Sequence, residues 1–256
     1  MSKISVVINT YNASEHLQEV LETVKDFDEV LICDMESTDN TLEIARKYGC
    51  NIVTFPKGNH KIVEPARNFA IQSAKHEWVL VVDADELVTP ELKKYLEKCA
   101  NEGNVSGLYI PRKNKYLGEY LPRFTCDHQL RFFKKKGTDW PTTIHSIPHV
   151  SGTVEYIPKN NDNLQLLHLA DDTISQAVNK MNRYTDYDME KKAHKHYGVL
   201  ALFYRPLWRF LRSYFLQGDF RCGGRGLIHA GMVAVYQFIF VAKMLEARYK
   251  QNSKKV

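Results

Sequence analysis

Cysteine is scarce in this chain of 256 residues, and its placement excludes two common ways of stabilising a fold. The five cysteines are Cys33, Cys50, Cys99, Cys126 and Cys222, an odd number, and no two of them form a CxxC pair. A disulfide framework needs paired cysteines, and a structural zinc site needs clustered ones. We therefore expect reduced thiols that serve mainly as packing residues.

The chain also lacks other features that would place it in a special class. It has no internal repeat and no low-complexity segment, and its beginning, MSKISVVINTYN, lacks the basic and apolar regions of a signal peptide. We therefore expect the active part to stay on the cytoplasmic side of the membrane. The content of 44% hydrophobic and 25% charged residues indicates a folded globular protein. At this length, one sizeable α/β domain with a helical appendage fits.

The first hundred residues alternate strand-length apolar runs with segments of helical spacing. The runs cover residues 4–8, 30–33, 52–55 and 78–82. Between them, apolar residues recur every three or four positions in segments 17–24, 42–48 and 66–73, with Asn12 as a candidate cap of the first segment. Strands that are apolar on both faces and alternate with helices predict a mostly parallel sheet covered on both sides.

The alternation ends after a helix start at Thr89, Pro90 and Glu91. Strand-like runs follow at 108–110 and 129–133, and the turn-like stretch 134–137 comes directly after the second run. From about Ser175 the pattern is helical. We predict an α/β domain over 1–172 and a helical C-terminal region over 173–256.

Polar residues follow three of the predicted parallel strands. They form the stretches Asn9–Asn12, Asp34–Thr41 and Asp83–Glu86. In open α/β sheets, ligands bind beyond the carboxyl ends of the strands, so we expect these stretches to share one edge.

Two carboxylates in a D-x-D spacing, Asp83 and Asp85, follow the strand WVLVV. They could bind a hard divalent cation that also bridges to substrate phosphates, with Asp34 and Asp39 on the same edge. An acidic turn before a helix N-terminus explains the same residues without a metal.

A haloacid-dehalogenase-type phosphatase also has a strand that ends in D-x-D, and Asp171 with Asp172 could supply its later acidic motif. That family places D-x-D at its first strand, whereas three strand–helix units precede Asp83. It also prefers Thr or Val where Leu87 stands, and it leaves DMESTDNT unexplained.

Four ordered motifs, ISVVINTYN, DMESTDNT, PARNFAIQSA and WVLVVDADE, resemble the nucleotide-sugar half of a family 2 glycosyltransferase with the GT-A fold. PRKNKYLG, QLRFFKKKG and the histidines of IHS and LLHL resemble the branch that includes lipopolysaccharide-core sugar transferases. The resemblance covers about two thirds of the chain. It implies a Rossmann-like central sheet flanked by helices, followed by a helical C-terminal extension.

The resemblance implies a nucleotide site on the first and second strand ends. Thr10, Tyr11 and Asn12 would line the nucleoside pocket, and Asp34 would hydrogen-bond the base, usually uracil. Arg67 would lie near the base or the diphosphate. Each has a structural alternative, since Asn12 could cap a helix and Arg67 could lie on a solvated face.

The resemblance also implies a site for Mg²⁺ or Mn²⁺, with Asp85 ligating the metal directly and Asp83 contacting the ribose or the metal. The metal would neutralise the departing nucleoside diphosphate, and in-line attack would invert the anomeric centre. We favour His168 as a further contact to the metal or to a phosphate.

The reaction also needs a base that removes a proton from the acceptor hydroxyl. Relatives of this branch usually have His-Glu where this chain has His145 and Ser146. His145, Asp127 and His168 remain as candidates, and we favour His145. Arg131, together with Gln129, is predicted to position the substrate, although Arg131 could equally pair with a structural acid.

Arginines and aromatic residues alternate between Lys195 and Arg225. Nucleic acid is not expected as a partner, because no recognition-helix, RNP or zinc motif accompanies them. A basic amphipathic helix in an anionic membrane interface fits better. Residues 226–242 carry no formal charge, but Gln237, two glycines and His229 argue against a membrane span. Membrane contact, a core helix and a subunit interface in a homo-oligomer all remain open for 226–245.

Together these features predict an inverting, metal-dependent glycosyltransferase. We expect it to use a nucleotide sugar, namely a UDP-sugar, at the inner face of the cytoplasmic membrane. The predicted acceptor is a glycolipid or a lipopolysaccharide-type molecule. The competing hypothesis is a non-catalytic nucleotide-sugar-binding or membrane-docking protein, which Ser146 suggests.

Overall fold

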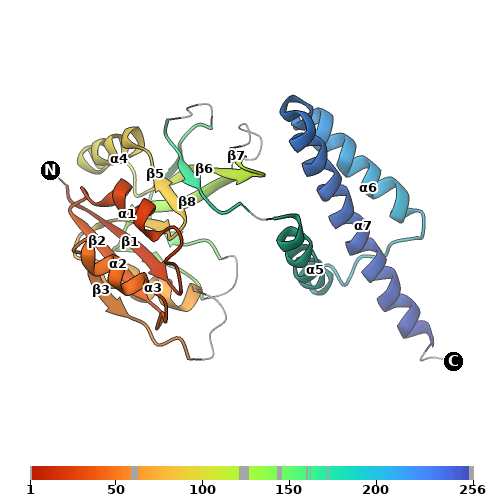
Figure 1. Cartoon of the computed structure of the whole chain (residues 1–256), viewed down its shortest axis with the longest axis horizontal. Coiled ribbons are helices and arrows are strands. Elements are labelled where there is room, and N and C mark those ends of the chain that lie inside the picture. The colour runs from red at the N-terminus through yellow and green to blue at the C-terminus, as the bar shows by residue number, and fades with distance from the viewer. Residues whose placement is uncertain are drawn as a thin grey trace. The chain divides into compact units, whose positions relative to one another are not determined.

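The computed structural model describes residues 2–58, 63–120, 127–142, 146–159, 161, 163–171 and 173–253. The chain divides into two compact units. The sheet unit comprises Met1–Lys115 and Thr125–Ala170, and the helical unit comprises Tyr116–Phe124 and Asp171–Val256. Figure 1 shows the strands gathered in the first unit and long helices in the second.

The first half of the sheet unit is the alternating pattern that the sequence predicts. Four parallel strands lie in the order β3-β2-β1-β4. The strands are β1 (Ile4–Thr10), β2 (Glu29–Asp34), β3 (Asn51–Thr54) and β4 (Trp78–Asp83). The helices between them are α1 (Leu17–Val24), α2 (Thr41–Lys47) and α3 (Glu64–Ser73). The predicted α/β class is confirmed.

The second half extends the sheet with mixed pairing. Beyond β4 the order continues β8-β6-β12-β5, and β8 runs antiparallel to both β4 and β6. These elements are β5 (Glu86–Val88), α4 (Pro90–Glu102), β6 (Gly107–Tyr116), β8 (Asp127–Lys134), β11 (Val154–Tyr156) and β12 (Leu166–His168). Strand β11 pairs with β6, and β9 (Thr138–Asp139) with β10 (His149–Val150) forms a separate two-stranded sheet.

Alternate residues of the central strands supply two hydrophobic cores, one on each face of the sheet. Val6 and Leu80 pack with Leu21 of α1 on one face, whereas Val7 and Val81 pack with residues of α3 on the other. Because side chains alternate along a strand, only a strand that is apolar at every position can be buried on both faces. This arrangement explains the continuous apolar runs.

Local sequence signals fix the start of α4 but not the start of α1. Thr89 Oγ1 accepts a hydrogen bond from Leu92 N–H at 3.3 Å, as predicted for an N-cap. The prediction that Asn12 caps the first helix is wrong. Helix α1 begins at Leu17, and Asn12 adopts φ 50° while its Oδ1 accepts from Thr38 N–H at 2.8 Å. A contact with a neighbouring loop therefore replaces the local cap.

The helical unit consists of three long helices and short connecting turns. They are α5 (Ile174–Lys191), α6 (Ala201–Leu211) and α7 (Gly223–Ser253), with a π-turn (Arg212–Leu216) and a 3₁₀-turn (Asp219–Cys222) before α7. The strand β7 (Glu119–Tyr120) also belongs to this unit. Helix α7 packs alongside α6 (Figure 1).

The hydrophobic core of the helical unit is small, with Ala201, Phe240, Val241 and Leu245 fully or nearly buried. By length and composition, the helical segment Asp219–Gln251 could cross a membrane, and its most apolar 18-residue window has a mean hydropathy of 1.5. Only 22% of its most apolar window is buried within the protein. Much of the apolar surface of this unit therefore faces outward.

Candidate functional site

A cavity of about 490 Å³ lies at the carboxyl ends of β1 and β4. At this point the strand order changes direction, because β2 and β3 are added on one side of β1 and β4 is added on the other. The loops that follow β1 and β4 therefore lead in opposite directions from the two neighbouring strand ends. Asn9 and Asp83 are paired in register there. Such switch points are where open α/β sheets bind ligands. The lining residues are Asn9, Tyr11, Asn12, Ala13, Glu15, His16, Val63, Arg67, Asp83, Ala84, Asp85 and His168.

Six of the predicted site residues line this strand-end cavity, and two others are buried at the ends of β1 and β2. The six are Tyr11, Asn12, Arg67, Asp83, Asp85 and His168. Thr10 and Asp34 do not line it, because each is only 1% exposed. Thr10 Oγ1 donates to Asp34 Oδ1 at 2.8 Å. Asp34 therefore ties the ends of β1 and β2 together.

Hydrogen bonds also join the loops that follow β1 and β2. Asp34 accepts from the backbone N–H of Ser37 at 2.8 Å and from its hydroxyl at 2.6 Å. Asn12 N–H in turn donates to Ser37 Oγ at 2.9 Å. These bonds hold the backbone of the Tyr11–Asn12 stretch at the cavity wall.

Asp39 makes a similar connection at the start of α2. Its carboxylate accepts from Ser14 N–H and from the N–H and hydroxyl of Thr41. Slight burial tends to raise the pKa of Asp39, but these hydrogen bonds outweigh it and lower the pKa to about 2. In this geometry Asp39 stabilises the N-terminus of α2.

Arginine side chains neutralise Asp83. Arg67 of α3 contacts Asp83 Oδ1 at 3.2 Å, and Arg131 of β8 hydrogen-bonds to Asp83 Oδ2. Burial would raise the pKa of Asp83, but Arg131 and Arg67 overcome it and hold the pKa well below its usual range. Arg67 is 11% exposed at its side chain, so the solvated-face alternative is wrong. Arg131 pairs with structural acids, as the second sequence-based interpretation proposed.

Glu86 and Asp127 extend this ionic network into the sheet. Glu86 is fully buried and accepts from Arg112 at 3.2 Å, and burial raises its pKa despite the arginines. Arg112 also contacts Asp127 at 3.0 Å. Burial opposes ionisation of Asp127, yet Arg112 and Gln129 lower its pKa. Because a base weakens as its pKa falls, this pairing disfavours Asp127 as the catalytic base.

Asp85 differs from its neighbours because it faces His168 and not an arginine. His168 Nε2 lies 3.3 Å from Asp85 Oδ2, and the two side chains are 21% and 34% exposed. The antiparallel pairing of β12 with β5 aligns His168 with Glu86, next to Asp85. The backbone N–H of Leu169 also donates to Asp85 O at 2.7 Å.

The structure does not support one metal-ligand set made of Asp83, Asp85 and His168. Both oxygens of Asp83 are occupied by arginines, and the described part of the chain has no group of three His, Cys, Asp or Glu side chains placed to hold a metal ion. Asp85 and His168 remain as a pair of oxygen and nitrogen donors at the cavity wall. A divalent cation that takes its other ligands from phosphate and water fits such a pair.

Asn9 begins the polar stretch that was predicted at this edge, and it lines the cavity, although no individual role was predicted for it. Its Oδ1 is buried and has no hydrogen-bond partner, and it lines the cavity beside Asp83. The signal in the sequence is an amide at the end of an otherwise apolar strand. Glu15 and His16 also line the cavity. They were not predicted there, because a helix capped by Asn12 would have included them, whereas α1 begins at Leu17.

His145, the favoured base, lies outside the described residues. The following Ser146, which stands where a glutamate was expected, donates its hydroxyl to Pro141 O at 2.5 Å. Among the described cysteines, Cys33, Cys50, Cys99 and Cys222 are free thiols, in agreement with the sequence-based prediction.

A protein-family model matches most of the sheet unit. The sequence model for "Glycosyl transferase family 2" matches residues 5–157. An uncharacterized glycosyltransferase of Rickettsia prowazekii is 28% identical over 99% of this chain and 90% of its own length. The lipopolysaccharide core biosynthesis glycosyltransferase LpsC of Rhizobium meliloti is 27% identical over 95% of this chain and 92% of its own.

Two solved structures share the fold along nearly the whole chain. A mannosyltransferase from Pyrobaculum calidifontis, solved with GDP-mannose and Mn²⁺, gives a TM-score of 0.58 at 13% identity and covers 95% of this chain and 87% of its own. Residues 1–349 of TarS from Staphylococcus aureus give a TM-score of 0.51 at 18% identity, covering 98% and 92%. The expected GT-A fold is confirmed, and the phosphatase alternative has no support.

Proposed function

Because the chain belongs to glycosyl transferase family 2 and is a glycosyltransferase, we propose that it transfers a sugar from a UDP-sugar with inversion. The proposed acceptor is a lipid-linked or lipopolysaccharide-type molecule, in keeping with the likeness to LpsC, so that the enzyme acts in cell-envelope glycan synthesis. We place the catalytic domain in residues 1–172 and the acceptor-associated region in 173–256.

The observation that carries the proposal is the strand-end cavity at the switch point. Its floor holds Asp83 in an ion pair with Arg67, and its wall presents Asp85 beside His168. Arginine and a carboxylate-bound cation are the groups that bind a diphosphate. Tyr11, 41% exposed and with Lys57 Nζ 3.7 Å from its ring centroid, offers an aromatic surface to a base.

Each residue then has a task. Asp85 and His168 would hold Mg²⁺ or Mn²⁺, which neutralises charge on the departing diphosphate. Arg67 contributes positive charge at the same wall, and Asp34 keeps the two nucleoside-binding loops in place. Arg131 keeps Asp83 ionised and fixed, so Arg131 is a positioning residue.

Removal of the acceptor proton requires a base that keeps an adequate pKa. We propose His145, since Asp127 is held by Arg112 and its pKa is lowered. His145→Ala should lower turnover at least tenfold while UDP affinity stays near wild type. Wild-type turnover in this variant would exclude His145 as the base.

Exposed apolar residues of the helical unit support an acceptor at a membrane surface. Phe203, Leu207 and Trp208 of α6 are 71%, 59% and 56% exposed. Large apolar residues on a basic helix favour insertion into the interface of an anionic membrane. We therefore propose a peripheral location on the inner face of the cytoplasmic membrane.

The decisive experiment is UDP binding and donor turnover in Asp85→Asn. This change keeps the side-chain shape but removes the charge that attracts a cation, so Mn²⁺-dependent UDP binding should fail in calorimetry. Turnover of a labelled UDP-sugar should fall at least ~10²-fold, and EDTA should abolish it in the wild type. Asp26→Asn, at an exposed acid between α1 and β2 that does not line the cavity, serves as the control.

Three results would contradict parts of the proposal. Normal, EDTA-sensitive turnover in Asp85→Asn would place the metal elsewhere. Preference for GDP or CDP over UDP would correct the donor. An absence of turnover in the wild type with every nucleotide sugar, despite binding, would support the non-catalytic hypothesis.

A further inference from the structure

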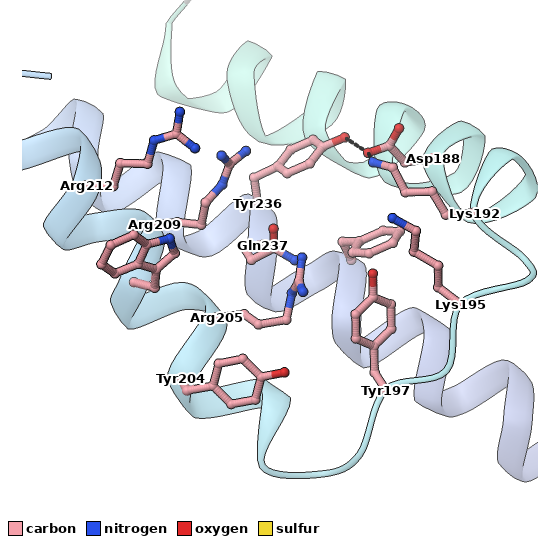
Figure 2. Close-up of a pocket in the computed structure, with 12 residues that line it drawn as sticks. Asp188, Lys192, Lys195, Tyr197, Tyr204, Arg205, Arg209, Arg212, Tyr236 and Gln237 are labelled. Atoms are coloured by element: carbon pink, nitrogen blue, oxygen red, sulfur yellow. Dashed lines mark hydrogen bonds and ion pairs between the residues drawn. The ribbon is translucent and has the colours of Figure 1, made fainter. Parts of the chain in front are cut away.

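A second cavity, of about 570 Å³, lies within the helical unit between α5, α6 and α7. Figure 2 shows side chains from all three helices and from the loop after α5 pointing into it. We call it the helical-unit pocket, and its lining residues are Asp188, Lys192, Lys195, Tyr197, Tyr204, Arg205, Trp208, Arg209, Arg212, Tyr236, Gln237 and Phe240.

The pocket has an excess of positive charge that the protein does not neutralise. Five basic side chains face a single carboxylate, that of Asp188. Lys192 Nζ donates a hydrogen bond to Asp188 Oδ2 at 2.5 Å, and the Tyr236 hydroxyl donates to the same oxygen at 3.1 Å. Within the described part of the chain, Lys195 and the three arginines form no ion pair. Four cations therefore remain for a ligand.

Two buried donors in the pocket have no acceptor. Gln237 is only 6% exposed, yet its Nε2 has no hydrogen-bond partner, and the same holds for Arg205 Nε. The Arg205 guanidinium lies 4.7 Å from the centroid of the Tyr197 ring, which orients it without giving its Nε–H an acceptor. Since buried polar groups in folded proteins are nearly always bonded, these donors indicate a missing ligand rich in oxygen acceptors.

Apolar surface on α6 adjoins the cationic pocket. Trp208 and Tyr204 line the pocket and are 56% and 58% exposed. Phe203 and Leu207, adjacent to them in the sequence, are also exposed. A soluble anion would leave this apolar surface exposed to water, whereas the acyl or prenyl chains of a lipid would cover it.

From these observations we propose that the helical-unit pocket binds the phosphate head group of a membrane lipid. Arg205, Arg209 and Gln237 donate to the phosphate oxygens, and the lipid chains lie against the exposed side of α6. This inference rests on the part of the proposed function that places the enzyme at a membrane, and it is independent of the donor nucleotide and of the metal.

The test compares variants of the full chain in sedimentation with phosphatidylcholine vesicles that contain or lack phosphatidic acid. Arg205→Gln/Arg209→Gln should weaken binding to phosphatidic acid vesicles by about tenfold or more, because two charge-assisted donors are lost. Arg183→Gln/Lys191→Gln removes the same charge from exposed positions of α5 outside the pocket, and it should weaken binding by less than about threefold.

Gln237→Leu gives a second test in which the net charge does not change. It should also weaken binding to phosphatidic acid vesicles, by about threefold or more, because its amide donors are lost. Unaltered UDP binding and circular dichroism would show that each variant is folded. Vesicles without phosphatidic acid should bind all variants equally weakly.

Each other outcome overturns the inference in a different way. Equal losses in the pocket and control variants would mean that diffuse charge attracts the membrane. Pocket-dependent binding of inorganic pyrophosphate or of an RNA oligonucleotide, without vesicle binding, would replace the lipid by another anion. If the wild type binds no vesicles, both this inference and the proposed membrane location fail, while UDP binding still tests the catalytic proposal.

Discussion

At the residue scale, the three carboxylates after β4 have three different environments. Asp83 is held by two arginines, Glu86 is fully buried against Arg112, and Asp85 remains partly exposed beside His168. Charge at a strand end is tolerated when each carboxylate has a partner. Here arginines from neighbouring elements serve as partners for two of the three, and His168 is the partner of Asp85.

Asp34→Ala should separate the structural role of this residue from its role in nucleotide binding. Removal of the carboxylate leaves the buried hydroxyl of Thr10 and the donors of Ser37 without an acceptor. The free energy of unfolding should fall by about 1–3 kcal/mol. UDP affinity, measured by calorimetry, should fall as well, because the two loops lose their connection.

Asp28→Ala is the matched control, since Asp28 accepts from Ile4 N–H at 2.9 Å at the opposite end of β1. It should lower stability without changing UDP affinity. If Asp34→Ala behaves in the same way, Asp34 is a structural residue only.

The low pKa of Asp39 predicts a dependence of stability on acid. A carboxyl group whose folded pKa is about 2 and whose unfolded pKa is about 3.9 stabilises the native state fully above about pH 4. That contribution disappears as the pH falls from about 4 to 2. Asp39→Asn should therefore show a flatter dependence of melting temperature on pH in this range than the wild type. Asp26→Asn should keep the wild-type slope.

At the element scale, β12 brings the chemistry of two distant segments together. Its antiparallel pairing with β5 places His168 beside Asp85, and Leu166, fully buried, anchors the strand. The signal for this strand in the sequence, LLH, is short. Its position in the sheet depends on which neighbour offers a free edge, and that is a property of the assembled fold.

Leu166→Ala should impair the site through this strand. The cavity left behind should lower the free energy of unfolding by about 2–5 kcal/mol. Mn²⁺-dependent UDP binding should weaken more than in Leu96→Ala, which removes an equally buried leucine from α4. Equal UDP affinity in the two variants, measured by calorimetry at a temperature where both are folded, would show that β12 does not position the metal pair.

At the scale of the whole molecule, the proposed donor site and the proposed lipid-phosphate site belong to different units. The strand-end cavity is built from the sheet unit alone, and the helical-unit pocket from the helical unit alone. The protein has a net charge of +5, and part of this excess faces the helical-unit pocket. If both proposals hold, these separate units would bind a soluble donor and a lipid phosphate independently.

The two binding activities should therefore be separable by mutation. Asp85→Asn should sediment with phosphatidic acid vesicles as the wild type does, and EDTA should have no effect on this binding. Arg205→Gln/Arg209→Gln should bind UDP and Mn²⁺ with wild-type affinity in calorimetry. Added salt should release the wild type from vesicles, because exposed charges are screened. Loss of both activities in either variant would show that the sites are coupled.

The sequence by itself determined the α/β class, the parallel core and the edge at which the polar loops meet. These depend on local periodicity, since an apolar run of strand length and a helical spacing each bury the same residues in any context. The cap of α4 at Thr89 was equally predictable, because it needs only contacts within four residues. Tyr11, Asn12, Arg67, Asp83, Asp85 and His168 were correctly expected near one another.

Only the tertiary structure decided how those residues are paired. Arg131 reaches Asp83 from 48 residues away and Glu86 from 45, across an antiparallel strand whose register no local pattern fixes. The tertiary fold also buries Asp34 and leaves Asn9 Oδ1 at the cavity without a hydrogen-bond partner. It places Asn12 in a hydrogen bond with Thr38 and not at the start of α1. Burial and charge pairing depend on neighbours that come together only when the sheet closes, and so they could not be deduced from spacing along the chain.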